Sequence, residues 1–383
     1  MKKLAIITTH PIQYYAPIFQ LIERSKKVNL KVFYTWGISS LKKNDPGFEK
    51  IIEWDIPLLE DYNYEFLLNI AKNPGTSHFN GIINPNIIDT LEHFKPDIIL
   101  VFGWSWHSHL KVLRNFKGRS TIWFRGDSNI LNQAYFTNPF KQLLKTLFLR
   151  WVYKHVDKAF YVGANNKSYY LKYGLRSDKL IFAPHAIDNS RFSEDRTPET
   201  IILRKRLNVP SEAILILFAG KFESIKNPKL LLKAFLNLKK DDVHLLFVGN
   251  GVLEDALRSI AKHPNIHFLN FQNQTQMPVI YQTCDLFCLP SFSETWGLSI
   301  NEAMACGKAI LASDGVGCAI DLIKPNINGE IFKSNNLVDL TEKLSKLTAD
   351  KKGIQNFGNN SKGIIQKWNF EAITNTLLYE LEN

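Results

Sequence analysis

Two glutamates, Glu294 and Glu302, are the side chains in this sequence whose type and spacing most directly indicate chemistry. Two apolar runs, 286–289 and 309–312, flank them, and both have the length and composition of buried strands. Glu294 lies in a Pro-Ser loop after the first run, and Glu302 lies in a helix predicted over 298–306. The order strand, loop, helix, strand predicts a βαβ unit in a parallel sheet. The loop of such a unit lies at the carboxyl edge of the sheet, where ligands bind.

The chemistry available at this loop is hydrogen bonding to hydroxyl groups and to phosphate. A carboxylate accepts hydrogen bonds, so Glu302 could hold vicinal hydroxyls of the kind that a ribose presents. Backbone N–H groups near Gly297, Leu298 and Ser299 lie at the predicted helix start, where unpaired donors and the helix dipole favour a diphosphate. Gly297 has no side chain to keep that phosphate away. A single loop glutamate is usually a solvated or capping residue, and the phosphate-suited backbone beside this pair favours a binding role.

Alternating strands and helices are predicted on both sides of this unit. The apolar runs that predict strands are 4–7, 30–34, 97–102, 120–124, 158–162 and 179–183 in the first half, and 214–219, 244–248 and 266–269 in the second. Helical spacing is found over 16–23, 230–238 and 368–381. Repeated alternation of strands and helices is typical of α/β proteins with parallel sheets.

The length of 383 residues favours two domains over a single core. The polar stretch Asn189 to Glu199 is the best candidate for a linker between them. We therefore predict two Rossmann-like domains, 1–188 and 189–365, that face a central cleft in which a ligand is held. The remaining segment, 366–383, is predicted to be a terminal helix that crosses back to pack on the first domain.

The composition is that of a soluble globular protein, with 45% hydrophobic and 22% charged residues. No apolar run reaches the roughly 20 residues that a membrane-spanning helix needs. The first ten residues contain two lysines and a short apolar run, which predict a first strand and not a signal peptide. Four cysteines without zinc-like spacing favour a reducing cytoplasm over a disulfide framework.

Positive charge is concentrated in one segment of the chain. The net charge is +11, and the segment 103–180 holds fourteen Lys or Arg residues and three acidic ones. A basic surface of this kind attracts anionic membrane headgroups, phosphate-bearing substrates or nucleic acid. Within it, 138–154 has apolar residues at helical spacing, and Pro139 is suited to a first turn. Two interpretations stay open: a core helix with a solvated basic face, or a helix that lies on a membrane surface.

Four spaced motifs resemble those of one enzyme family. They are Gly220-Lys221 with Lys226, Val248-Gly249-Asn250-Gly251, the pair Glu294 and Glu302, and the helix from Glu302 to Gly307. In this order they are similar to the donor domain of retaining glycosyltransferases of family 4, which have the two-domain GT-B fold. The resemblance covers roughly residues 180 to 335. Within it, the turn Pro184-His185-Ala186-Ile187-Asp188 differs at two positions from the Pro-Asn-Gly-Val-Asp turn that is usual in the family.

The resemblance implies roles for the residues at the matched positions. Glu294 would bind the transferred sugar, and Lys221 and Lys226 would stabilise the charge that develops on the leaving nucleotide. Lys221 stands where the family usually has arginine, so it offers a point charge without a bidentate fork. The implied donor and nucleotide contacts are Glu302, Gly297, Leu298, Ser299, Thr295, Trp296, Gly249, Phe271 and Gln272. The Phe271 ring could stack on the nucleotide base or belong to the core.

The first domain departs from the family pattern in two loops. The loop after the first strand is usually rich in glycine, and here His10 or Gln13 would replace its backbone contact with the diphosphate. The histidine that usually follows the fourth strand is replaced by Arg125-Gly126-Asp127. Asp127 could act in catalysis by binding a sugar hydroxyl or orienting the acceptor, and Arg125 could neutralise an acceptor phosphate; an ion pair within the loop is the alternative. The remaining first-domain candidates are His107 and His109.

The implied activity is retaining transfer of a sugar from a UDP or GDP sugar to a saccharide or lipid-linked saccharide acceptor in cell-surface glycan synthesis. No Asp-x-Asp motif is found, and lysines with a helix terminus could offset the diphosphate charge, so neither a metal ion nor a cofactor is expected. The expected location is the cytoplasm, peripheral on the inner face of the cell membrane, with an anionic membrane surface as a partner and no nucleic acid. Two alternatives are a module that binds a polyanion or nucleic acid, and a GT-B nucleotide-sugar epimerase. The acidic pair argues against the first, because two carboxylates would repel the phosphates of a nucleic acid.

Overall fold

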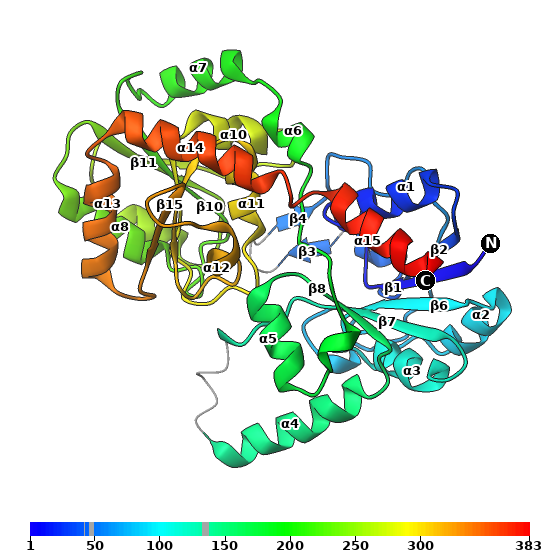
Figure 1. The fold of residues 1–383 in the computed structure, drawn as a ribbon. Coiled ribbons are helices and arrows are strands. Elements are labelled where there is room, and N and C mark those ends of the chain that lie inside the picture. Colours follow the sequence, from blue (N-terminus) through cyan, green and yellow to red (C-terminus); the bar gives the residue numbers. More distant parts are fainter. Residues whose placement is uncertain (42, 46–49, 132–137) are drawn as a thin grey trace. The chain divides into compact units, whose positions relative to one another are not determined.

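The computed structural model describes residues 1–41, 43–45, 50–131 and 138–383 (Figure 1). The chain forms two compact units. Unit 1 contains Met1–Lys43, Pro57–His185 and Phe370–Asn383, and unit 2 contains Asn44–Ile56 and Ala186–Asn369. The last helix of the chain therefore belongs to the same unit as the first strand.

Unit 1 is built on a sheet of seven parallel strands in the order β5-β2-β1-β6-β7-β8-β9. The bounds are β1 (Lys3–Thr8), β2 (Asn29–Tyr34), β5 (Tyr64–Phe66), β6 (Ile98–Phe102), β7 (Thr121–Arg125), β8 (Lys158–Tyr161) and β9 (Leu180–Phe182). The central strands are continuous apolar runs because both faces of the sheet are covered, and all five residues of β6 are buried. The edge strand β5 was not predicted, since three residues are too few to show a pattern.

The helices described in unit 1 are α1 (Ala16–Arg24), α2 (Ile87–Phe94), α3 (His107–Phe116), α4 (Pro139–Tyr153), α5 (Ala164–Lys172) and α15 (Phe370–Glu382). The terminal helix α15, red in Figure 1, lies beside α1, which is blue. The Lys2 ammonium donates to the Leu381 carbonyl at 2.6 Å, and Lys158 pairs with Glu380. These bonds connect α15 to the residue before β1 and to β8.

Unit 2 is built on a sheet of six parallel strands in the order β12-β11-β10-β13-β14-β15. The bounds are β10 (Ile214–Ala219), β11 (Val243–Val248), β12 (Ile266–Leu269), β13 (Leu286–Leu289), β14 (Ala309–Ser313) and β15 (Gly329–Phe332). A separate two-stranded sheet pairs β3 (Lys43–Asp45) with β4 (Lys50–Ile52). The two large parallel sheets confirm the predicted α/β class.

The helices described in unit 2 are α6 (Asn189–Ser193), α7 (Thr197–Arg206), α8 (Pro228–Leu238), α9 (Glu254–Ile260), α10 (Met277–Thr283), α11 (Leu298–Ala305), α12 (Ala319–Leu322), α13 (Leu337–Leu347) and α14 (Lys351–Ile365). Helix α11 is the one predicted to follow the Glu294 loop. It packs against α6, α10 and α14 and joins β13 to β14, as expected for a βαβ unit.

The stretch predicted as a linker, Asn189 to Glu199, is folded. It forms α6 and the first turn of α7. The Asp188 side chain accepts the Arg191 N–H at 3.0 Å as a helix cap, and Phe192 is fully buried against Tyr281. The polar composition that suggested a linker belongs to the outer faces of two short helices.

None of the helices in the described part of the chain is both long and apolar enough to cross a membrane.

Candidate functional site

The candidate site of unit 2 lies where its strand order reverses, between β10 and β13. The connection after β10 leads to its neighbour β11, whereas the connection after β13 leads away to β14. In an open parallel sheet this switch point, at the carboxyl ends of the strands, is where ligands bind. The two loops concerned are 220–227 and 290–297.

Lys226 and Glu294 form an ion pair that joins these two loops. Their side chains are 25% and 16% exposed, so the pair is shielded from water without being buried. Backbone bonds fix the second loop, because Phe292 N–H donates to the Ile225 carbonyl at 2.8 Å and Glu294 N–H donates to the Gly315 carbonyl at 3.0 Å. The fold therefore brings together two of the four residues predicted to be catalytic. A third, Lys221, is half-buried at the start of the first loop.

Two glycines let the loops after β10 and β11 approach each other. Gly220 has a φ of +155° and Gly249 a φ of +140°. A Cβ on Gly249 would lie 2.0 Å from the Gly220 carbonyl oxygen, so only glycine fits there. Phe222 N–H donates to the Asn250 carbonyl at 2.9 Å across the same contact. Gly249 was predicted as a nucleotide contact. Its close approach to Gly220 explains by itself why this position is glycine.

Gly297 is the N-cap residue of helix α11 and has a φ of +101°. A Cβ on Gly297 would lie 2.9 Å from Val316 and 3.2 Å from Leu289. The turn and its packing therefore require this glycine, which is a different reason from the predicted approach of a phosphate. Its neighbours Thr295, Leu298 and Ser299 are all partly exposed. The N–H groups of the first turn are the donors that an anion would meet here.

Glu302 lies one turn further along α11 and is 4% exposed. The hydroxyl of Tyr281, which is buried on α10, donates to Glu302 Oε2 at 2.8 Å. This bond fixes the orientation of the carboxylate, since an ionised carboxylate can only accept. Tyr281 was not predicted as part of the site, because its sequence position shows only that it belongs to an apolar helix.

Trp296 differs from its predicted role as a nucleotide contact. The side chain is buried, its indole N–H donates to Asn301 Oδ1 at 3.0 Å, and its ring lies 5.3 Å from that of Trp368. The Trp296 carbonyl accepts the Cys318 N–H at 2.9 Å. Both the ring and the carbonyl are therefore used inside unit 2, where they hold the loop before α11 in place.

Asn250 holds the loop that follows β12. Its Oδ1 accepts the Phe271 N–H at 2.8 Å, and its Nδ2 donates to Glu254 Oε2 at 2.8 Å. Phe271 and Gln272 are both half-buried, and Gln272 Nε2 donates to the Asn270 carbonyl at 2.9 Å. A fixed, partly exposed aromatic ring is suited to stacking on a flat ligand.

Arg125, in unit 1, was predicted to neutralise an acceptor phosphate, and its observed position does not suit that role. It is 2% exposed, and its two terminal nitrogens donate to the carbonyls of Ala183 and Pro184, each at 2.8 Å. Burial lowers the pKa of the guanidinium from its usual value, and the nearby Tyr15 and Asp127 partly oppose that shift. Arg125 therefore fixes the segment after β9 and faces no solvent from which an acceptor could approach.

Asp127, Tyr15 and His185 lie close together at the carboxyl edge of unit 1. Of these, Tyr15 and His185 were not predicted as site residues. Asp127 is half-buried after β7, and its charge adds to the effect of burial in raising the pKa of Tyr15 to about 12. The Tyr15 ring stacks on that of His185, with centroids 6.3 Å apart. Burial, and secondly Arg125, hold the pKa of His185 well below its usual value, so this imidazole is neutral at pH 7. The signal that could have found Tyr15 and His185 is their position just after the ends of strands.

The other first-domain candidates lie on the loops after β1 and β6. His10 Nδ1 is 2.8 Å from the Thr9 hydroxyl, and its ring meets the ring of Trp36 edge-on at 5.3 Å. Gln13 is buried. His107 is exposed at the start of α3. Because β1 and β6 are neighbours where the strand order of unit 1 reverses, these loops flank the ligand-binding edge of that sheet.

His109 is a buried structural group. Its Nδ1 lies 3.0 Å from the carbonyl oxygens of both Phe102 and Gly103, so Nδ1 carries the proton and donates. Its Nε2 lies 2.8 Å from the Thr35 hydroxyl. Burial lowers the pKa of His109 to about 4.

We expect the free energy of unfolding to fall as the pH drops from about 6.5 towards 4. The unfolded chain binds a proton at His109 with a pKa near 6.5 and the folded chain only near 4, so the unfolded state gains protons in this window. The His109 contribution between pH 6.5 and pH 5 is on the order of 2 kcal/mol. Urea denaturation of wild type and His109→Gln at both pH values measures it. Equal losses in the two proteins would show that His109 is not responsible.

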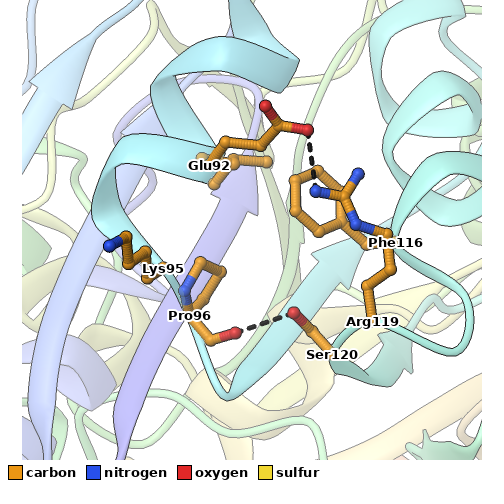
Figure 2. Close-up of a pocket in the computed structure, with 7 residues that line it drawn as sticks. Glu92, Lys95, Pro96, Phe116, Arg119 and Ser120 are labelled. Carbon is orange, nitrogen blue, oxygen red and sulfur yellow. Dashed lines mark hydrogen bonds and ion pairs between the residues drawn. The ribbon is translucent and has the colours of Figure 1, made fainter.

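The cavity drawn in Figure 2 lies at the opposite edge of the unit 1 sheet. It has a volume of about 450 Å³ and is lined by Leu91, Glu92, Lys95, Pro96, Phe116, Arg119 and Ser120. Glu92 pairs with Arg119 at 2.7 Å, and the Ser120 hydroxyl donates to the Pro96 carbonyl. Pro96 precedes β6 and Ser120 precedes β7, which places this cavity at the amino edge and outside the candidate site. Among the described residues, no three His, Cys, Asp or Glu side chains are grouped to hold a metal ion.

Residues 199–363 match the family described as Glycosyl transferases group 1. The matched segment lies in unit 2 and contains both loops of the ion pair, helix α11 and the buried Glu302. The match therefore covers the part of the chain that carries the candidate site.

Two curated relatives share part of the sequence. The chain is 27% identical over 182 residues to a D-inositol 3-phosphate glycosyltransferase of Salinispora arenicola, which covers 43% of this chain and 40% of that protein. It is 26% identical over 238 residues to the N,N'-diacetylbacillosaminyl-diphospho-undecaprenol alpha-1,3-N-acetylgalactosaminyltransferase of Campylobacter jejuni, which covers 60% of this chain and 61% of that protein. The chain thus spans less than two thirds of the length of either relative.

The whole chain resembles a solved structure in fold. The crystal structure of Anabaena Alr3699/HepE in complex with UDP and glucose matches with a TM-score of 0.72, 17% identity and full coverage of both chains. At this level of identity the likeness concerns the fold. Together with the two parallel sheets it shows that the chain has the predicted GT-B fold.

Proposed function

We propose that this chain, through the glycosyltransferase group 1 domain at residues 199–363, is a retaining glycosyltransferase of family 4 that transfers a sugar from a nucleotide diphosphate. The observation that carries the proposal is the Lys226–Glu294 ion pair, which joins the loops after β10 and β13 beside the start of α11. A cation, a carboxylate and helix N–H groups at one switch point suit a ligand that is anionic in one part and hydroxylated in another.

Each of the four parts of the donor would have its own contacts. The diphosphate would lie against Lys226, Lys221 and the first turn of α11, where fixed positive charge meets it without reorganisation. Glu294, released from its ion pair by the competing phosphate, would accept hydrogen bonds from the sugar. Glu302 would accept those of the ribose, with Tyr281 holding its orientation. Phe271 would stack on the base.

Transfer would then retain the anomeric configuration. The acceptor oxygen attacks the anomeric carbon from the face that the diphosphate leaves; the new C–O bond forms as the bond to phosphate breaks, and the departing phosphate takes the proton of the acceptor hydroxyl. The protein contributes positioning and stabilisation of the charge on the leaving group. Since Lys221, Lys226 and the helix terminus supply that charge, we propose that neither a metal ion nor a cofactor is required.

The donor and acceptor classes follow from chemistry shared with the relatives. The Anabaena structure holds UDP and glucose, which supports a donor of the UDP or GDP type. The names of the two relatives contain an inositol phosphate and a diphospho-undecaprenol, and both groups are anionic. The basic excess of 103–180 in unit 1 suits an anionic acceptor, so we place acceptor binding in unit 1 and choose a saccharide or lipid-linked saccharide of cell-surface glycan synthesis. Work on such an acceptor would occur in the cytoplasm, at the inner face of the cell membrane.

The test is binding and turnover with full-length protein. We expect UDP or GDP to raise the melting temperature, since a nucleotide at 100 times its Kd stabilises the folded state by about 2.7 kcal/mol. A panel of UDP and GDP sugars should show nucleotide release, unchanged by EDTA, and product NMR should show the donor's anomeric configuration. If neither nucleotide raises the melting temperature and no donor is consumed, the transferase proposal is wrong. Inversion in the product would contradict the retaining part alone.

A further inference from the structure

Helix α4 is apolar on two sides, and only one of them is buried in the core. Leu149, Val152 and Tyr153 are buried in the core of unit 1. The other side exposes five large side chains, Phe140 (65%), Leu143 (54%), Leu144 (51%), Leu147 (55%) and Phe148 (42%), which we term the α4 apolar face. At 3.6 residues per turn the five lie within an arc of about 140°. Helix α4 is therefore a core helix, as the first interpretation expects, and its exposed side is apolar, which leaves the second interpretation open.

Positive charges border the α4 apolar face on both sides. Helical spacing places Lys141 and Lys145 along one border and Arg150 along the other, and the helix contains no Asp or Glu. The cap of α4 is neutral too, since the Asn138 side chain accepts the first N–H groups. Burial and the nearby ammonium of Lys172 both lower the pKa of Lys145, so a second helix adds positive charge here.

The acidic residues of the surrounding segment do little to offset these cations. Of the three in 103–180, Asp157 pairs with Lys117 and Asp178 with Arg176 at 2.6 Å. Each pair is therefore locally neutral and lies off α4. The surface around the α4 apolar face keeps its positive charge.

We propose that the α4 apolar face enters the interface of an anionic lipid bilayer, with the helix lying in the plane of the surface. Its leucines and phenylalanines would leave water for the acyl boundary, and Lys141, Lys145 and Arg150 would meet lipid phosphates. Burial of the apolar side chains and attraction between the bordering cations and anionic headgroups would both favour binding to the same partner. The inference rests on the proposed function in one respect, because it would bring the protein to a lipid-linked acceptor.

Charge also argues against a second copy of the chain as the partner. Pairing of two α4 apolar faces would bring two sets of cations together, with no acidic residue on either helix to offset them. Like charges placed together across an interface oppose association. An anionic lipid surface removes that repulsion and gains attraction.

The test compares binding of full-length protein to vesicles of phosphatidylcholine alone and of phosphatidylcholine with phosphatidylglycerol. We expect sedimentation mainly with the anionic vesicles, and at least a tenfold loss of affinity in Leu143→Ser/Leu147→Ser. The matched control is Ile201→Ser/Ile202→Ser, which removes two neighbouring side chains on α7 that are 62% and 67% exposed. The control should bind as wild type does. Equal binding by wild type and the α4 variant, or equal binding to both vesicle types, would overturn the proposal.

Two further readouts separate the possible outcomes. Nucleotide release from a soluble donor should be the same in Leu143→Ser/Leu147→Ser as in wild type, so loss of vesicle binding with intact release supports the surface independently of the transferase proposal. Lys141→Glu should weaken binding to anionic vesicles and leave the melting temperature within about 1 °C of wild type, since an exposed substitution costs little. A wild-type dimer that Leu143→Ser/Leu147→Ser converts to a monomer would assign the face to a second copy and overturn the lipid assignment.

Discussion

Replacement of Lys226 by methionine is expected to lower kcat/KM for sugar transfer by about 10²- to 10³-fold, the range found when one group that stabilises a developing negative charge is removed. Methionine keeps most of the length of the side chain and removes its charge. The same change removes the Lys226 ammonium from its ion pair with Glu294, which is 16% exposed. Steady-state kinetics with the donor identified by the nucleotide screen measures the loss. The matched control is Lys233→Met, an exposed lysine on α8 that should behave as wild type.

The structure also allows the two roles of Lys226 to be separated. If Lys226 contacts the diphosphate, Lys226→Met should weaken the binding of free UDP or GDP, which carries no sugar, whereas Glu294→Gln should not. If Lys226 acts only by holding Glu294, the two single variants and the double variant should lose the same activity and all should bind free nucleotide as wild type does. We expect the first result. Free-nucleotide affinity unchanged by Lys226→Met would remove the lysine from the diphosphate site.

Most strands of the two large sheets could be predicted because each is a continuous apolar stretch of sequence. The run Ile98–Phe102 is apolar throughout and Val243–Val248 is apolar except for His244, as expected for strands of a parallel sheet whose two faces are both covered. The elements that prediction missed depend on the rest of the fold. The polar segment after Asp188 folds as α6 because Phe192 finds a buried place against Tyr281, 89 residues further along the chain.

In the candidate site too, some features could be predicted from the sequence and others depend on contacts that only the fold creates. Lys226 and Glu294 could be assigned to one site in advance, because both follow strands of the same predicted sheet, but their ion pair was not predicted. The burial of Arg125 could not be predicted, since it depends on two carbonyls 58 and 59 residues away. An arginine or lysine directly after a strand gives the same sequence pattern whether its side chain binds a ligand or donates hydrogen bonds to a neighbouring segment. The bond from Tyr281 to Glu302 is of this kind too, as only the packing of α10 on α11 creates it.

Helix α4 shows a further limit of pattern reading. Its apolar residues occupy both sides of the helix, so periodicity alone could not say which side packs on the core. The structure settles this by burying Leu149 and Val152 and exposing Leu143 and Leu147. The partner that we propose for the exposed side rests on the charge around it, which can be read from the sequence.

Replacement of Gly249 by alanine is expected to lower the free energy of unfolding by about 3 kcal/mol or more. The new Cβ would lie 2.0 Å from the Gly220 carbonyl oxygen, and the residue would have to keep a φ of +140°. Each of these costs on the order of 1–3 kcal/mol, for backbone strain and for overpacking. The obstacle is backbone and not a flexible side chain, so relief requires the loops after β10 and β11 to separate. Urea denaturation of the full-length protein measures the loss.

The matched control is Gly363→Ala on α14, where a Cβ would meet no atom within 4 Å. That change should be neutral or stabilise the protein by up to about 1 kcal/mol, because alanine is the better helix former. Separation of the two loops by Gly249→Ala would also move Lys221, so nucleotide affinity should fall even at temperatures where the variant is folded. Equal stability of the two variants would show that the contact between Gly220 and Gly249 does not constrain the site. A destabilised variant with unchanged nucleotide affinity would instead place Lys221 outside the diphosphate contact while leaving the role of Lys226 intact.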